Sequence, residues 1–208
     1  MEVSVSFLKE GNYKQYLKEI NNTKADYIHF DVMDGKFVKN KNLPLKELLE
    51  LIFLSNKKND VHLMVQDPSK YIEKLALYDV EYLTIHKEIP NYLELINKIK
   101  SYGIKAGIAV NPDTKIEDIF PLLDKINLVL IMGVTPGLSG QEFILETENK
   151  INKLKEEIRK KNLKVKISVD GGIKEEILPK VVNADIIVSA SYVLNDFNNI
   201  SKIKNISN

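Results

Sequence analysis

The stretch His29-Phe30-Asp31-Val32-Met33-Asp34-Gly35 decides how the fold of this chain is interpreted. It belongs to an apolar, β-prone run, and its imidazole and first carboxylate are two residues apart, so both side chains point to the same face of one strand. Two other segments are built in the same way, Val61-His62-Leu63-Met64 and Ser168-Val169-Asp170-Gly171-Gly172. If the three strands share one sheet, their polar groups can converge on a single divalent metal ion.

Length and composition indicate one compact domain, residues 1–208. The chain has 208 residues, of which 44% are hydrophobic, enough to bury roughly 70% of the surface that the unfolded chain exposes. Its net charge is +1 and no basic block is interleaved with aromatic residues, so we expect no nucleic-acid partner. There is no cysteine, which excludes disulfides and thiolate zinc sites.

The N-terminal sequence has no basic start followed by a long apolar stretch, and no run approaches the ~18 apolar residues of a membrane span. We therefore expect a cytoplasmic protein with no membrane contact. Whether it forms a homo-oligomer is left open, because exposed helix faces and dimer faces share the same amphipathic pattern.

Short apolar runs alternate with amphipathic segments along the whole chain. Eight runs are predicted strands: 3–7, 27–31, 61–65, 82–86, 105–110, 128–133, 165–170 and 186–189. Helix-patterned segments lie between them at 13–20, 45–53, 69–77, 92–102, 116–123, 143–161 and 174–181, and a closing helix is indicated by Phe197, Ile200 and Ile203.

This alternation predicts an α/β fold with parallel strands and right-handed crossovers. Eight units predict a (β/α)8 TIM barrel, and a doubly wound open sheet is the competing architecture. The polar residues favour the barrel, because they fall toward the C-terminal ends of their strands, the rim that carries the chemistry in such barrels. These residues are His29, Asp31, His62, His86, Asp170 and Ser189.

The set His29, Asp31, His62 and Asp170 suits a hard or borderline divalent cation. A histidine taken alone is more often a hydrogen-bonded core side chain than a ligand. The aspartates reverse that interpretation, because an unpaired charge inside a barrel costs several kcal/mol and no Lys or Arg occupies the inward register of these strands. We expect one divalent metal ion, Zn²⁺ in the first place, with Fe²⁺, Mn²⁺ and Co²⁺ as alternatives.

Three methionines and three turns complete the candidate site. Met33, Met64 and Met132 lie near the ends of predicted strands; they either fill the core or form an apolar, polarizable floor that contacts the substrate. Turns of small residues at 135–141, 170–173 and 189–191 follow the sixth, seventh and eighth strands. Glycine often only closes a βα loop, but three such turns in succession favour a phosphate site, because barrel phosphate sites cluster near strands seven and eight.

In order along most of the chain, these segments resemble the ribulose-phosphate 3-epimerase family. Residues 29–38 are similar to its H-x-D-V-M-D-G-x-F-V segment and 61–65 to its V-H-L-M-V strand; 84–88, 106–112, 132–141 and 168–173 follow in family order. The resemblance implies a (β/α)8 barrel in which Asp31 and Asp170 are the acid/base pair and also bind the metal with His29 and His62. It implies a substrate and phosphate site lined by Ser6, His62, Gly137, Leu138, Ser139, Gly140, Gly171, Gly172, Ala190 and Ser191. Leu138, Ser139 and Ala190 depart from the family pattern, which usually has Phe, Gly and Gly there.

The implied reaction interconverts D-ribulose 5-phosphate and D-xylulose 5-phosphate, which differ only in configuration at C3. Proton removal there leaves an enediolate, whose charge a cation would stabilise, and inversion requires a second group on the opposite face. Three alternatives remain. The same chemistry would serve a 3-epimerase of a six-carbon ketose phosphate such as D-allulose 6-phosphate. A related decarboxylase group is disfavoured because Met33 occupies its lysine position. A non-catalytic sugar-phosphate-binding barrel would not require the acid/base pair.

Overall fold

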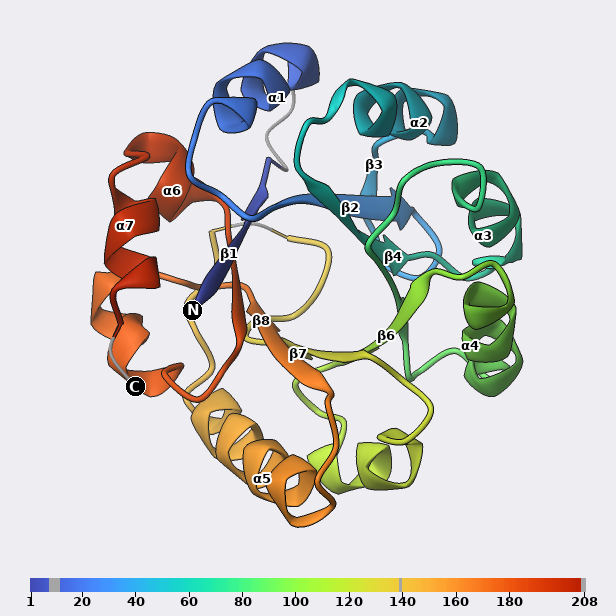
Figure 1. The fold of residues 1–208 in the computed structure, drawn as a ribbon, viewed down its shortest axis with the longest axis vertical. Helices are drawn as coiled ribbons and strands as arrows, with labels where there is room; N and C mark the ends of the chain where they lie inside the picture. The colour runs from blue at the N-terminus through green and yellow to red at the C-terminus, as the bar shows by residue number, and fades with distance from the viewer. Residues whose placement is uncertain (8–11, 139, 207–208) are drawn as a thin grey trace.

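The structure is a computed structural model and describes residues 1–7, 12–138 and 140–206. A closed ring of parallel strands forms its centre, with helices around the outside (Figure 1). The ring consists of β1 (Glu2–Ser6), β2 (Tyr27–Asp34), β4 (Lys58–Met64), β5 (Tyr82–His86), β6 (Lys105–Val110), β7 (Leu128–Met132), β8 (Lys166–Asp170) and β9 (Ile186–Ser189). Because β1 pairs with both β9 and β2, the ring closes. The predicted (β/α)8 barrel is confirmed, and the doubly wound open sheet is wrong.

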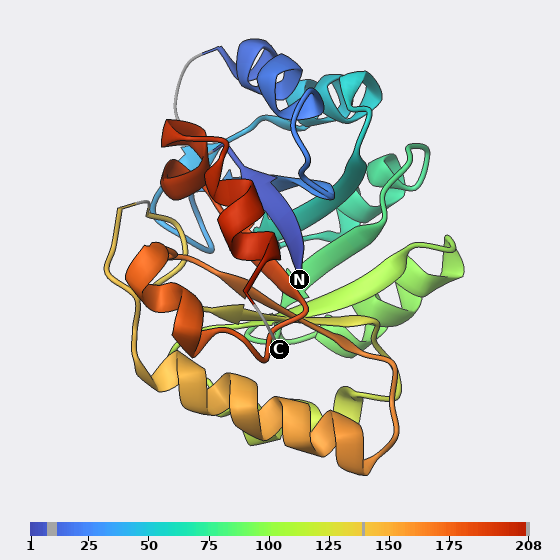
Figure 2. The ribbon, with the colours of Figure 1, turned by 60° about the vertical axis from the view of Figure 1, so that its left-hand side comes forward.

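The helices lie on the outer surface of the barrel, as the view in Figure 2 also shows. Those before β9 connect successive strands, and the last two follow β9. They are α1 (Tyr13–Asn21), α2 (Leu45–Leu54), α3 (Ser69–Leu75), α4 (Tyr92–Ser101), α5 (Glu146–Lys160), α6 (Ser191–Asn195) and α7 (Asn199–Lys204), together with the 3-10 helices η1 (Ile116–Leu122) and η2 (Glu175–Lys180). Among the described residues, no helix has the length and apolar character that a membrane crossing requires.

Several local features differ from the sequence expectation; β2, for example, runs on to Asp34, and β4 begins at Lys58. A short strand β3 (Lys41–Asn42) pairs antiparallel with the end of β2. The segments expected as ordinary helices near 116–123 and 174–181 are the 3-10 helices η1 and η2, which contain Pro121 and Pro179. Proline has no backbone N–H and disrupts the α-helical hydrogen-bond ladder. The fifth helix begins three residues later than residue 143, because the Ile144 N–H donates to the Gly133 carbonyl and holds that segment against the end of β7.

Strand alternation divides the buried side chains into two layers. In β2, Ile28, Phe30 and Val32 pack outward against the helices, while Tyr27 belongs to a separate apolar cluster inside the barrel. That inner cluster comprises Tyr27, Tyr82, Ala109, Leu128, Leu130, Met132, Ile186 and Val188. His29 and Asp31 share the inward register of Tyr27 and lie farther along the strand, toward the C-terminal rim. The barrel thus has an apolar interior and carries its candidate polar groups toward one end. That residues 1–208 form one domain stays a prediction.

Candidate metal and active site

Pairing between the strands brings the four predicted ligands together. His29 and Asp31 share one face of β2, and Asp31 lies beside His62 of β4 in the parallel register. Asp170 ends β8 on another part of the ring. One ligand atom from each of these four side chains lies within 4.8 Å of the others. The sequence therefore predicted a cluster that the fold assembles from three strands.

The distances inside this cluster are those of a compact polar centre. His62 Nδ1 lies 3.1 Å from Asp31 Oδ1 and 4.0 Å from Asp170 Oδ2. His29 Nε2 lies 3.4 Å from Asp31 Oδ1. Both imidazoles are fully buried, whereas the Asp170 side chain is 16% exposed. The other oxygen of Asp31, Oδ2, accepts a hydrogen bond of 2.7 Å from the Ser6 hydroxyl.

His29 shows whether these residues fit a metal ion. Its Nδ1 lies 2.7 Å from Asp60 Oδ2. An ionised carboxylate only accepts, so Nδ1 carries the proton, while the buried Nε2 has no hydrogen-bond partner among the described residues. Burial lowers the pKa of His29, but Asp60 and Asp31 more than offset this and hold the pKa well above its usual value. The cluster attracts positive charge at this nitrogen and fits a divalent cation, with Asp60 supporting His29 as carboxylates support metal-bound histidines.

The two aspartates of the cluster have opposite proton affinities. Burial raises the pKa of Asp31, but His29 and His62 overcome that effect and hold the pKa well below its usual range. Burial, followed by the negative charge of Asp31, raises the pKa of Asp170 to about 7. Carboxyl groups whose environments separate their pKa values in this way are suited to acid and base roles. A bound cation lowers the proton affinity of both.

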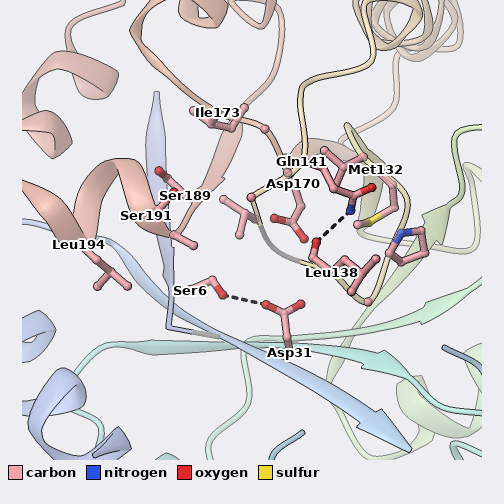
Figure 3. Close-up of a pocket in the computed structure, with 18 of the residues that line it drawn as sticks. Ser6, Asp31, Met132, Leu138, Gln141, Asp170, Ile173, Ser189, Ser191 and Leu194 are labelled. Atoms are coloured by element: carbon pink, nitrogen blue, oxygen red, sulfur yellow. Dashed lines mark hydrogen bonds between the residues drawn. The ribbon is translucent and has the colours of Figure 1, made fainter. Parts of the chain in front are cut away.

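A pocket of about 360 Å³ opens beside Asp31 and Asp170, which face one another in Figure 3. Its volume is in the range of small-molecule sites. Most of the residues predicted to contact substrate line it: Ser6, Met33, Met64, Met132, Gly137, Leu138, Gly140, Gly171, Gly172, Ala190 and Ser191. Ser139 lies outside the described residues. His62 is fully buried and is not among the lining side chains, and its predicted contact with substrate stays a prediction.

The turn after β8 is tightly packed. Gly171 and Gly172 have φ angles of +102° and +69°, in the left-handed region that glycine occupies readily. A Cβ on Gly172 would lie 2.7 Å from both N and Cα of Phe143. Glycine at position 172 therefore allows the turn after β8 to lie directly against the backbone of the segment before α5.

Two buried partners of the cluster had no predicted role. Asp60 precedes His62 by two residues and accepts hydrogen bonds from His29 and Ser4. His86 lies 2.8 Å from His62, Nε2 to Nε2, and its Nδ1 lies 3.0 Å from Glu88 Oε2. Both had a sequence signal: Asp60 shares the inward face of its strand with His62, and His86 ends the next strand.

Fold and site together define a (β/α)8-barrel enzyme with two imidazoles and two carboxylates beside a pocket at its rim. The chain matches the "Ribulose-phosphate 3 epimerase family" over residues 2–194. It is 37% identical over 197 residues to the ribulose-phosphate 3-epimerase of Bacillus subtilis, covering 92% of this chain and 88% of that one. The corresponding protein of Methanocaldococcus jannaschii is 34% identical over 199 residues, covering 94% and 84%. The chain therefore belongs to the ribulose-phosphate 3-epimerase family, and the prediction of an isomerase is confirmed.

Solved structures of other enzymes show the same architecture. The tryptophan synthase alpha subunit of Campylobacter jejuni matches with a TM-score of 0.64 and 17% identity, covering 99% of this chain and 93% of that one. Phosphoribosyl anthranilate isomerase of Thermococcus kodakaraensis matches with a TM-score of 0.64 and 15% identity, covering 99% and 97%. At these identities the likeness concerns the fold alone.

Proposed function

We propose that this protein is a metal-dependent 3-epimerase that interconverts D-ribulose 5-phosphate and D-xylulose 5-phosphate. The observation that carries the proposal is the cluster of His29, Asp31, His62 and Asp170, two of whose members line the rim pocket. Relatives that are at least a third identical over most of the chain bear the name of this activity. Zn²⁺ is the metal we expect, with Fe²⁺, Mn²⁺ and Co²⁺ as alternatives that suit the same ligands.

Asp31 and Asp170 are proposed to move the proton at C3. They belong to β2 and β8 and face one another at the pocket (Figure 3), so each can reach one face of a sugar lying between them. One carboxylate removes the C3 proton and the other delivers a proton to the opposite face, which inverts the centre. Ser6 donates to Asp31 Oδ2 and orients it. A divalent cation held by the cluster supplies Lewis-acid stabilisation of the negative charge that develops on the substrate oxygens.

The remaining lining residues are proposed to bind and enclose the substrate. Backbone N–H groups in the turns at 171–172 and 190–191 can hold the phosphate without a cationic side chain, and 137–140 lies along the same pocket. The methionines Met33, Met64 and Met132 are each at most 4% exposed. Their apolar side chains exclude water from the reacting carbon.

The acid/base assignment is tested by Asp31→Asn and Asp170→Asn. Each variant should lose at least ~10²-fold in turnover in a coupled epimerase assay, with an unchanged circular dichroism spectrum. Solvent deuterium should enter at C3 during turnover, as followed by NMR. Near-native turnover of either variant, or the absence of deuterium at C3 in product formed by the parent enzyme, would contradict the two-carboxylate scheme.

Metal dependence and substrate choice need separate measurements. Mass spectrometric metal analysis of the purified chain should find about one divalent ion per chain, and its removal by a chelator should abolish epimerase activity until the ion is restored. Comparing turnover of D-ribulose 5-phosphate with that of D-allulose 6-phosphate distinguishes the five-carbon enzyme from the six-carbon alternative. A chain that binds sugar phosphates but turns none over after metal reconstitution would be the non-catalytic barrel.

A further inference from the structure

The third histidine of the chain, His86, has no part in the proposed chemistry, yet it is fully buried against the cluster. It ends β5, and its ring lies beside that of His62, with centroids 4.9 Å apart and an interplanar angle of 28°. Its two ring nitrogens contact different partners. Nε2 lies 2.8 Å from His62 Nε2, and Nδ1 lies 3.0 Å from Glu88 Oε2.

Glu88 determines which nitrogen of His86 carries a proton. Its carboxylate offers only acceptors. Oε1 accepts from the Asn111 N–H at 3.0 Å and from the Thr114 hydroxyl, and Oε2 faces His86 Nδ1. Nδ1 must therefore be the donor in that contact. In a neutral ring, the lone pair then lies on Nε2 and faces His62.

The contact with His86 favours one of the two tautomers of His62. Two nitrogens 2.8 Å apart need one hydrogen between them, and His86 Nε2 accepts, so His62 Nε2 donates. With Nε2 as the donor, a neutral His62 has its lone pair on Nδ1, which lies 3.1 Å from Asp31 Oδ1 and 4.0 Å from Asp170 Oδ2. A lone pair and an ionised carboxylate repel one another, so this tautomer requires a cation at Nδ1, whereas a proton on Nδ1 would instead donate to Asp31. The tautomer with its lone pair on Nδ1 is the one in which His62 can bind a cation between the two aspartates.

We propose that Glu88, acting through His86, is a positioning residue that selects the metal-binding tautomer of His62. The inference deepens the proposed function and rests on its metal site. Which imidazole nitrogen binds a metal is set by the hydrogen bond that the other nitrogen makes. With the chain of hydrogen bonds reversed, His86 Nε2 would donate to His62, and a proton on His62 Nδ1 would bond to Asp31 and occupy the direction of the metal.

A second side chain anchors the loop that contacts Glu88. Lys150 of α5 donates from Nζ to the carbonyl groups of Asn111, at 3.2 Å, of Pro112, and of Thr114, at 2.7 Å. The loop after β6 is therefore anchored by Lys150 and by Glu88 together. Glu88 has one oxygen for this loop and one for His86, so its orientation is determined by contacts outside the metal site.

Glu88→Gln tests the proposal with almost no change in shape. The loop presents two donors and His86 one, so the amide oxygen of the substituted side chain should face the loop and its NH₂ group should face His86. The chain of hydrogen bonds then reverses. We expect the dissociation constant for Zn²⁺, measured by competition with a fluorescent chelator, to rise about 10–100-fold. Long-range ¹H–¹⁵N NMR of the full chain before Zn²⁺ addition should show less protonation of His62 Nδ1 in the parent than in E88Q, because in the parent Glu88 opposes the pull of Asp31 on that proton.

Two further comparisons separate hydrogen-bond direction from packing. Thr114→Val removes a loop partner of Glu88 but keeps the contact between Glu88 and His86, so its Zn²⁺ affinity should stay within about twofold of the parent. His86→Gln can still accept from His62 and donate to Glu88, whereas His86→Leu can do neither. H86Q should lose less than about tenfold in Zn²⁺ affinity, and H86L about 10–100-fold.

The Zn²⁺ affinities and the His62 tautomer together decide whether the inference stands. Equal affinity of the parent and E88Q for Zn²⁺, with an unchanged His62 tautomer, would overturn this inference and leave the proposed epimerase intact. An equal loss in T114V and E88Q would also overturn it, because loop packing would then account for both. Failure of the parent chain itself to bind Zn²⁺ or the alternative metals would overturn both this inference and the metal dependence of the proposed function.

Discussion

The turn after β8 allows a stability prediction from geometry alone. Gly172→Ala places a side chain at a φ of +69°, which costs an L-residue ~1–2 kcal/mol. The added Cβ would also lie 2.7 Å from two backbone atoms of Phe143, and relieving such overpacking costs ~1–3 kcal/mol. The two costs together come to about 2–5 kcal/mol. For a chain of this size, that lowers the melting temperature by roughly 4–20 °C.

Gly103→Ala is the matched control. Gly103 has a φ of +77°, but a Cβ there would meet nothing within 4 Å, so only the conformational cost of ~1–2 kcal/mol should appear. Urea unfolding followed by circular dichroism gives both free energies of unfolding, with equal m-values as the check that the unfolded states are comparable. If G172A is no less stable than G103A, the close contact between the turn and Phe143 does not constrain the chain and the reasoning is refuted.

Three further predictions concern charge, metal and loop anchoring. Because the pKa of Asp170 is raised to about 7, a metal ion must displace its proton below that pH. The pKa of His29, another proposed ligand, is also raised, so apparent Zn²⁺ affinity should fall at least about tenfold per pH unit below about 7. A flat profile from about pH 5.5 to 8 in chelator competition would contradict this. Zn²⁺ at about 100 times its dissociation constant should stabilise the folded parent chain by about 2.7 kcal/mol. Differential scanning calorimetry should show a smaller Zn²⁺-induced rise in melting temperature for D170N than for the parent. Lys150→Met should cost ~1–3 kcal/mol in urea unfolding, because it removes the Nζ donor from three loop carbonyls; an unchanged free energy would show that water replaces it.

The strands and the cluster were readable from the sequence because two simple periodicities control them. His29 and Asp31 are two apart in an apolar run, which fixes their common face. Parallel strands in a barrel bring their C-terminal ends to one rim, so His62 and Asp170 could be added without knowing the pairing register. The turns were predicted from their small residues, and the family resemblance then indicated which individual residues line the site.

The unpredicted features depend on information that is not local. Asp60 becomes a partner of His29 because these two residues are neighbours in the β2–β4 register, and that register cannot be deduced from either strand alone. The role of Glu88 depends in the same way on a loop that returns from β6. Pro121 and Pro179, by contrast, were visible signals that an ordinary helix would be interrupted, and the hydrophobic pattern around them outweighed that signal.

The strands and the connecting segments contribute different residues to the site. The groups proposed to do the chemistry sit on the hydrogen-bonded ladder, where a shift of any one strand disturbs its neighbours on both sides. Leu138 and Ala190 instead line the pocket from connecting segments. Substitutions there can retune which ligand fits while the reactive centre stays as it is. Ligand preference and the proposed reactive groups therefore lie on separate parts of the chain, so that a change in one need not disturb the other.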